Sequence, residues 1–149
     1  MSVMHRNATY ETFGGDRTLV CDYAHWSVQV RPKQVTLGAL VILAHTDAVA
    51  FSDLPVEAFA ELATVVKDVE AVCASTFANT KVNYLMLMMV DPHVHFHVLP
   101  RYDAPVMFEG TPYSDPGWPG QPNLAVSEGL PAAARVANRL RSAWPKRQV

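Results

Sequence analysis

The sequence predicts a single α+β domain with a mainly antiparallel sheet of about five strands, one long helix and a short C-terminal helix. Three observations predict this class. Strand and helix patterns follow one another in the order strand-strand-strand-helix-strand-strand-helix, which is typical of α+β domains. The length suits one domain over residues 1–149, and no internal repeat divides the chain. Half of the residues are apolar and only 17% are charged, as in folded globular proteins.

The first three strands are predicted by β-branched and aromatic residues between turn signals. Residues 17–24 and 26–31 alternate loosely between apolar and polar side chains, which is typical of strands, and Pro32 ends the second segment. Residues 38–43 are almost continuously apolar. This pattern predicts a strand that is buried on both faces.

The clearest helix pattern follows the third strand. It begins with a helix-start signal formed by Ser52, Asp53 and Pro55. Apolar residues then recur at spacings of three and four, and the predicted apolar stripe consists of Phe59, Leu62, Val66, Val69, Cys73 and Phe77. The faces predicted to meet water carry Glu57, Glu61, Lys67 and Asp68.

Two more strands complete the predicted sheet, at residues 82–89 and 93–101, on either side of a turn at Asp91. Seven of the eleven prolines then lie between Pro100 and Pro131. We interpret residues 102–131 as a long ordered or semi-ordered loop rather than a second domain. Loops of this length are usually functional or flexible. Pro131 opens a short helix that continues to about residue 143.

Charge and cysteine content restrict the partners and the compartment. The formal net charge of -2 gives no broad basic field, so nucleic acid is not an expected partner. Two cysteines, without CxxC spacing, are too few for a disulfide framework and fit a reducing compartment. We find neither a signal-peptide pattern nor an apolar run of membrane length. We therefore expect a soluble cytoplasmic protein that does not bind membranes.

Three histidines alternate with apolar residues in the run His-Val-His-Phe-His-Val-Leu-Pro, which ends at Pro100. Because successive side chains of a strand point to opposite faces, we expect His93, His95 and His97 to share one face. The intervening apolar residues then face a core. An imidazole with an ordinary pKa of about 6.5 is mostly neutral at pH 7, so it can attack, accept a proton or donate one. The run predicts a site that handles phosphate.

Two other interpretations of the run are a structural role and a metal site. Three alternating histidines make a poor core. In a strand, the Cα atoms of His93 and His97 lie roughly 13 Å apart, whereas metal–nitrogen bonds measure about 2 Å. A straight strand thus offers an ion two neighbouring histidines but hardly three, and we expect no metal site. We favour nucleophilic catalysis at phosphorus, in which His95 attacks and its neighbours bind phosphate oxygens and handle the leaving group's proton.

The run from His93 to Arg101 resembles the signature of the histidine-triad (HIT) nucleotide hydrolases and transferases. The resemblance implies that His95 becomes transiently nucleotidylated. It also implies that His93 and His97 orient this nucleophile, bind the α-phosphate and assist the leaving group. His97 is similar to the hydrolase-like branches, because uridylyltransferase-like members carry glutamine there. A weaker resemblance extends over roughly residues 26–102.

The resemblance also implies three substrate-binding residues and one departure. Asn83 resembles the family asparagine that approaches the phosphate. Arg31 stands seven residues before Gly38, where a ribose-binding asparagine or aspartate is typical, and it either meets a phosphate or lies at the surface. Arg101 either reaches a distal phosphate or pairs with a carboxylate. Ala39 occupies the place of a supporting histidine of the family, and the sequence does not identify its replacement.

A homodimeric enzyme that acts at the α-phosphate of nucleotides is what the resemblance implies. Its leading substrates are dinucleoside polyphosphates and nucleoside phosphoramidates, and the nucleotidyl-histidine passes its nucleotide to water or another acceptor. We expect no cofactor, apart from a Mg²⁺ ion that a polyphosphate substrate itself chelates. Residues 88–92 lack the family's usual glycine and polar phosphate contacts. A nucleotide-binding regulatory module with little turnover is therefore an alternative, and a metal-dependent hydrolase is a third.

Overall fold

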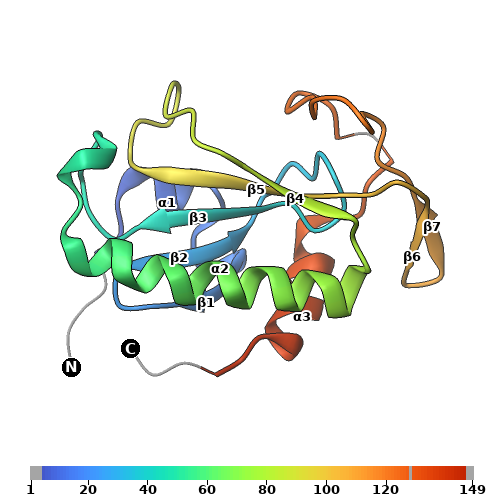
Figure 1. Cartoon of the computed structure of the whole chain (residues 1–149), viewed down its shortest axis with the longest axis horizontal. Coiled ribbons are helices and arrows are strands. Elements are labelled where there is room, and N and C mark those ends of the chain that lie inside the picture. Colours follow the sequence, from blue (N-terminus) through green and yellow to red (C-terminus); the bar gives the residue numbers. More distant parts are fainter. Residues whose placement is uncertain (1–4, 128, 147–149) are drawn as a thin grey trace.

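The computed structural model describes residues 5–127 and 129–146, and it confirms the predicted α+β class (Figure 1). A five-stranded antiparallel sheet has the strand order β1-β2-β3-β5-β4. Its strands are β1 (Leu19–Asp22), β2 (Trp26–Val30), β3 (Leu40–Ala44), β4 (Lys81–Leu85) and β5 (His95–Arg101). The long helix α2 (Val56–Phe77) and the C-terminal helix α3 (Ala133–Ala143) lie close to where the sequence predicts them.

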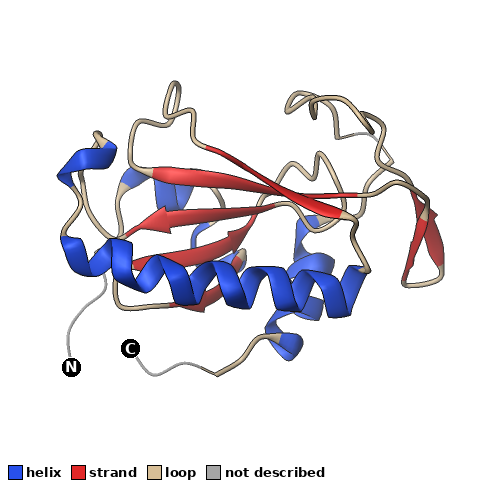
Figure 2. Cartoon of the chain, viewed as in Figure 1, coloured by secondary structure: helices blue, strands red, loops and turns tan. Residues whose placement is uncertain are grey.

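Helix α2 crosses one face of the sheet (Figure 2), so the two faces of the sheet have different surroundings. The main core between helix and sheet includes Trp26, Val28, Ile42, Val98, Val65, Val69 and Cys73. Since side chains alternate along each strand, the intervening residues of β3 and β5 point to the opposite face. There Val41 lies across from His97, and Leu43 lies across from His95. We call this side of the sheet the histidine face.

Helix α2 buries the C-terminal half of the predicted stripe, Val69, Cys73 and Phe77, whereas Phe59 is 41% exposed. It also buries Val65, which lies outside the predicted stripe. Asp68, which was predicted to face water, is buried and accepts a hydrogen bond of 2.7 Å from the hydroxyl of Tyr23. This partner compensates for the burial of the carboxylate. The apolar residues of the helix therefore form two stripes: one faces the core, and the flanking stripe contains Leu62 and Val66. The 3₁₀ turn η2 (Phe51–Asp53) precedes the helix.

Two strand boundaries beside the histidines differ from the prediction. Strand β4 ends at Leu85 rather than at residue 89, and β5 begins at His95 rather than at residue 93. Met88 has a φ of 49°, in the left-handed region that strands do not contain, so the chain leaves the sheet before residue 89. The pair between Leu85 and His97 is the last of the ladder that joins β4 to β5.

A short N-terminal helix, which the sequence analysis did not predict, covers the histidine face. Helix α1 (Ala8–Thr12) begins after Asn7, whose side chain accepts a hydrogen bond from the backbone N–H of Tyr10. The 3₁₀ turn η1 (Gly15–Arg17) follows. A small buried cluster joins this region to the sheet, formed by Tyr10, Phe13, Val41 and Leu43.

Residues 102–131 are not the uninterrupted loop that their proline content predicted. They contain a two-stranded hairpin of β6 (Val106–Phe108) and β7 (Thr111–Tyr113), which projects at one end of the molecule (Figure 1). Glu109 and Gly110 at its tip have φ values of 50° and 80°, as tight hairpin turns require. Glutamate is not among the residues that favour this conformation, so the sequence signal was weak.

A buried ion pair fastens the segment after the hairpin to the sheet. The Nε of Arg101 donates a hydrogen bond of 2.6 Å to Asp115, and the two side chains are only 5% and 1% exposed. The same guanidinium donates a hydrogen bond of 2.8 Å to the backbone carbonyl of Gly120. Because a buried charge without its partner is costly, this pair holds the segment in place.

Replacing Asp115 tests this role. We expect Asp115→Ala to lower the free energy of unfolding by about 3 kcal/mol, because the guanidinium of Arg101 stays buried without a carboxylate. Urea unfolding measures the change. Glu109→Gln is the control, since it breaks an ion pair with Arg135 in which both side chains are about half exposed, and it should cause no measurable loss. Equal losses in the two variants would contradict the assigned role.

Candidate active site

The structure brings the three predicted histidines together on the histidine face. The rings of His95 and His97, on β5, meet edge to face with their centroids 4.9 Å apart. His93 precedes the strand, but its ring contacts Thr9 of α1. The other two rings lie against Phe13, which caps the same helix. All three imidazoles therefore meet the N-terminal segment on one side of the sheet.

His95 is held in the form that a nucleophile needs. Its Nδ1 lies 2.6 Å from the backbone carbonyl of His93. A carbonyl only accepts hydrogen bonds, so Nδ1 carries the proton and the lone pair of the neutral ring is on Nε2. Burial is the main influence on the ring and lowers the pKa of His95 below its ordinary value. His95 is thus neutral near pH 7, with Nε2 able to attack.

His97 is held in the opposite tautomer. The Nε of Arg31 donates a hydrogen bond of 3.3 Å to Nδ1 of His97. A nitrogen that accepts carries no proton, so the proton of the neutral ring is on Nε2. Burial lowers the pKa of His97 to about 4, and the neighbouring His95 and Arg31 contribute to the shift. Near pH 7, His97 is therefore a neutral hydrogen-bond donor at Nε2.

Arg31 occupies this position beside a small residue. Its backbone N–H donates a hydrogen bond of 2.9 Å to the carbonyl of Ala39. Ala39 is fully buried and packs with Val35 and Leu99. A methyl group has neither donor nor acceptor, so residue 39 cannot orient His97, and the contact comes from Arg31 instead. The sequence predicted Arg31 as a substrate-binding residue but did not identify this contact with the triad.

His93 contributes both its backbone and its ring. Its carbonyl fixes the tautomer of His95, and its Nδ1 lies 2.7 Å from the hydroxyl of Thr9. The Nε2 of His93 is 4.0 Å from a carboxylate oxygen of Asp47, which also lies 2.8 Å from Nε2 of His5. His93 is the most accessible ring of the triad, with 16% of its side chain exposed. The N-terminal segment therefore fixes the first histidine.

Thr9 and Phe13 are the site residues that sequence reasoning missed. Neither belongs to a motif, and both precede the first predicted strand. The available signal was the helix cap at Asn7, because asparagine is a favoured residue at helix N-termini. It could have revealed the helix but not its position over the histidines, which depends on contacts between residues more than 80 positions apart.

Asn83 and Arg101 do not join the histidines. The Nη1 of Arg101 donates a hydrogen bond of 2.7 Å to the side-chain oxygen of Asn83. Of the two roles open to Arg101, the structure shows the ion pair with a carboxylate, that of Asp115. Both residues line a separate pocket beside β4. Whether either one contacts a substrate stays a prediction.

Within residues 5–127 and 129–146, no group of three or more His, Cys, Asp or Glu side chains is arranged to hold a metal ion. Over the same residues, no helix is both long and apolar enough to cross a bilayer.

The sheet, the covering helix and the clustered imidazoles define a histidine-triad type of α+β protein. The family model described as the HIT domain matches residues 20–104, which is more than half of the chain. The chain therefore belongs to the HIT domain family. No curated protein matches the sequence.

Solved structures share the fold at low sequence identity. A histidine triad protein from Marinobacter aquaeolei VT8 is 16% identical with a TM-score of 0.67, and the match covers 96% of this chain and 97% of that one. Diadenosine triphosphate hydrolase from Plasmodium falciparum is 14% identical with a TM-score of 0.62, covering 85% and 76%. The NitFhit protein of C. elegans is 22% identical with a TM-score of 0.62; the match covers 87% of this chain but spans only 28% of NitFhit.

The low pKa of His97 predicts a loss of stability in acid. In the unfolded chain this histidine titrates at about 6.5, and in the folded protein only at about 4. Between these values the unfolded chain binds more protons, so the free energy of unfolding falls as the pH decreases from 6.5 toward 4. Urea unfolding at stepped pH measures this loss, and His97→Asn should flatten it. The same slope in both proteins would show that His97 titrates normally.

Proposed function

We propose that the protein is a nucleotide hydrolase or transferase that acts at the α-phosphate through a nucleotidyl-histidine intermediate on His95. The observation that carries this proposal is the hydrogen bond between Nδ1 of His95 and the carbonyl of His93, which leaves the Nε2 lone pair free. A neutral, oriented imidazole is a nucleophile that splits one difficult hydrolysis into two transfers.

In the first step, Nε2 of His95 forms a bond to the α-phosphorus, and the bond from phosphorus to the leaving group breaks. The leaving atom takes its proton from the protonated ring of His93, which becomes neutral, whereas His97 keeps its single N–H. The ring of His95 becomes cationic as the new bond forms, and its hydrogen bond to the carbonyl strengthens because the donor is then charged. The Nε2–H of His97 donates to a non-bridging phosphate oxygen, where negative charge develops.

In the second step, water or another acceptor attacks the phosphorus, and the bond to His95 breaks. The acceptor's proton passes to the neutral ring of His93, which returns to its protonated starting state, and a nucleoside monophosphate or its ester leaves. Arg31, beside His97, supplies a cation that can bind a phosphate oxygen. This assigns Arg31 two functions, the orientation of His97 and the binding of substrate.

Two substrate classes fit this chemistry, dinucleoside polyphosphates and nucleoside phosphoramidates. The fold shared with a diadenosine triphosphate hydrolase supports the first class. Both classes place a scissile bond at an α-phosphorus, and neither requires a bound cofactor, although a polyphosphate substrate can carry Mg²⁺. We place the reaction in the cytoplasm, because the cysteine content fits a reducing compartment.

Burial of the nucleophile favours one alternative function. Only 1% of His95 and 6% of His97 are exposed, and the ring of Phe13 lies 5.5 and 5.8 Å from their ring centroids. A phosphate can reach Nε2 of His95 only after this cover shifts. If Phe13 stayed over His95 when a nucleotide bound, the protein would be a nucleotide-binding module with little catalysis. Detection of the covalent intermediate separates the enzyme from such a module.

Replacement of His95 tests the proposed reaction. His95→Asn should reduce the hydrolysis of an adenosine phosphoramidate by more than about 10³-fold, because it removes the nucleophile. Its melting temperature should stay near that of the wild type. Rapid acid-free quenching and intact-mass measurement should show a wild-type adduct of one nucleoside monophosphate, absent from His95→Asn. Full activity in the folded variant would contradict the role of His95.

We also propose that the protein is a homodimer whose sheets join through β4. Among the strands of the described residues, β4 pairs only with β5, so its outer edge presents unpaired backbone groups. At the opposite edge, Arg141 of α3 donates hydrogen bonds of 2.7 Å to the carbonyls of Leu19 and Arg17, which blocks that edge. The two edges are therefore not equivalent.

An apolar surface beside β4 supports the same arrangement. On the side of the sheet that α2 covers, a shallow cavity of about 190 Å³ lies between the helix and the strand. It is lined mainly by Ile42, Leu62, Val66, Tyr84 and Phe96. Leu62 and Val66 form the flanking stripe of α2, which the core leaves only partly covered. A second copy related by a twofold axis extends the sheet and buries the stripe.

A charge on this stripe should prevent association. We expect Val66→Glu to be monomeric at concentrations where the wild type is dimeric, because the dimer would bury an unpaired carboxylate. Sedimentation velocity measures the two states. Thr64→Glu, at an exposed position of the same helix, is the matched control and should stay dimeric. A monomeric wild type, or a dimeric Val66→Glu protein, would rule out this interface.

A further inference from the structure

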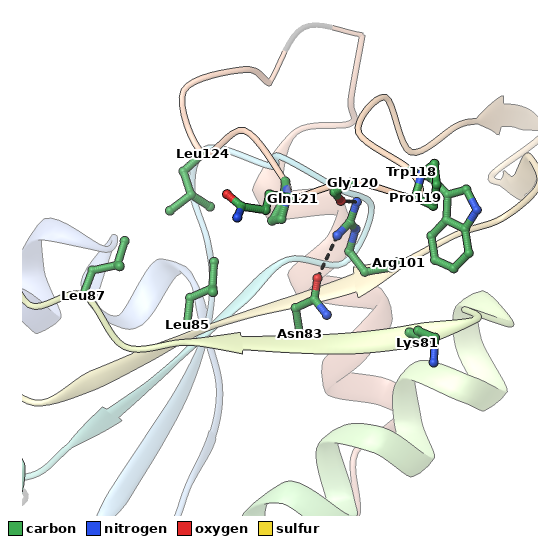
Figure 3. A pocket seen from close by; sticks show the side chains of 11 residues that line it. Lys81, Asn83, Leu85, Leu87, Arg101, Trp118, Pro119, Gly120, Gln121 and Leu124 are labelled. Carbon is green, nitrogen blue, oxygen red and sulfur yellow. Dashed lines mark hydrogen bonds between the residues drawn. The ribbon is translucent and has the colours of Figure 1, made fainter.

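A pocket of about 650 Å³ lies on the histidine face, beside the edge strand β4 (Figure 3). Its floor comes from alternate residues of that strand, Lys81, Asn83 and Leu85, together with Arg101. Its roof is the segment after the hairpin, which contributes residues 118–122 and Leu124. The volume is within the range of small-molecule sites, about 300–1,000 Å³. The function proposed above does not use this pocket.

One end of the pocket lies beside His97. Leu85 lines the pocket and is the direct cross-strand neighbour of His97. In antiparallel sheets such neighbours have Cα atoms about 5 Å apart. Leu87, two residues further toward the His95 end, also lines the pocket. A substrate group that leaves the α-phosphorus and extends past Leu85 therefore enters the pocket without crossing the sheet.

The pocket has an apolar end and a polar centre. Figure 3 shows Leu85, Leu87 and Leu124 at one end of the pocket, and Leu85 is the cross-strand neighbour of His97. The amide groups of Asn83 and Gln121 lie further along, and the indole of Trp118 stands at the far end. Amides present both donors and acceptors, and an indole offers an aromatic surface for stacking. This combination matches a planar ring with a hydrogen-bonding edge.

The charges of the pocket argue against a site for bare phosphate. The guanidinium of Arg101 is paired with the carboxylate of Asp115 and also donates to Asn83 and Gly120, so most of its donors are occupied. Lys81 is the other cation in the lining, and it lies at the exposed rim. Polyphosphate recognition usually uses several free donors or cations. A ring system fits the lining better than a chain of phosphates.

The pocket is preformed by close contacts. A Cβ atom added to Gly117 would lie 2.9 Å from the carbonyl of Gln121 and 3.4 Å from Nη2 of Arg101, so only glycine fits there without movement. The backbone N–H of Gly117 donates a hydrogen bond of 3.1 Å to Asp115, so the ion pair of Arg101 and Asp115 holds the same turn. A site that is ordered before binding loses less entropy when a ligand enters.

We propose that this pocket binds the leaving-group half of the substrate, and that it selects a planar aromatic or heterocyclic ring. The inference rests on the proposed function, because it assumes nucleotidyl transfer to His95. The ring is either the second nucleobase of a dinucleoside polyphosphate or the aromatic amine of a phosphoramidate. Both share the chemistry that Trp118, Asn83 and Gln121 recognise. A leaving group without a ring gains nothing from the pocket.

Three substrates with the same nucleotide half test the proposal. They are adenosine 5′-phosphoramidate, which releases ammonia, an adenosine phosphoramidate of an indole amine, and a diadenosine tetraphosphate with Mg²⁺. Wild-type kcat/KM should be at least about tenfold higher for one or both ring-bearing substrates than for the first. The substrate that shows this preference identifies the ring. Turnover of all three at equal kcat/KM would overturn the pocket proposal alone, whereas turnover of none would overturn the proposed function.

A variant that fills the pocket provides the second arm. Gln121 is exposed, so Gln121→Trp should fold normally while it occupies the space between Leu124 and Asn83. Its kcat/KM should fall by about tenfold or more for the preferred ring-bearing substrate, mainly through KM, and stay within about twofold for adenosine 5′-phosphoramidate. Met107→Trp, exposed on the hairpin, is the control and should change neither value. An equal fall for both substrates in Gln121→Trp would contradict a leaving-group site.

Discussion

Strand β5 lies between β3 and β4, and the alternation of its side chains organises the whole molecule. Phe96 and Val98 point toward α2 and enter the main core, so His95 and His97 must point to the other face. A shift of register by one residue would exchange these two sets and place imidazoles in the core. The apolar residues of β5 therefore keep the histidines in position, and the site depends on the core as much as on its own contacts.

Once the rings share a face, their chemistry is set by two hydrogen bonds of different origin. The carbonyl of His93 fixes one tautomer at His95, whereas the guanidinium of Arg31 fixes the other at His97. Of these two adjacent rings, His95 therefore offers a lone pair at Nε2, whereas His97 donates a hydrogen bond from Nε2. Ala39 leaves residue 39 without a polar group, and Arg31, bonded to it through the backbone, supplies the contact. The departure from the family pattern at Ala39 is therefore matched by a second departure at Arg31.

The sequence predicted what depends on local periodicity, and it missed what depends on contacts between distant residues. Five strands and the long helix follow from patterns within each segment, and the alternation of the histidines predicted their common face. The cover by Phe13, the partner of Arg101 and the burial of Asp68 follow from packing between segments far apart in the chain. The hairpin at Glu109 was missed because its turn residues carry a weak signal.

The central claim is that the nucleotide is bonded to His95 between two displacements at phosphorus. The stereochemical course of the reaction tests it most directly. A substrate whose α-phosphorus is chiral through sulfur and oxygen isotopes is hydrolysed in labelled water, and the configuration of the product is determined by ³¹P NMR. Two successive inline displacements, through His95, predict net retention of configuration. Net inversion would mean that water attacks the substrate directly, and it would contradict the account.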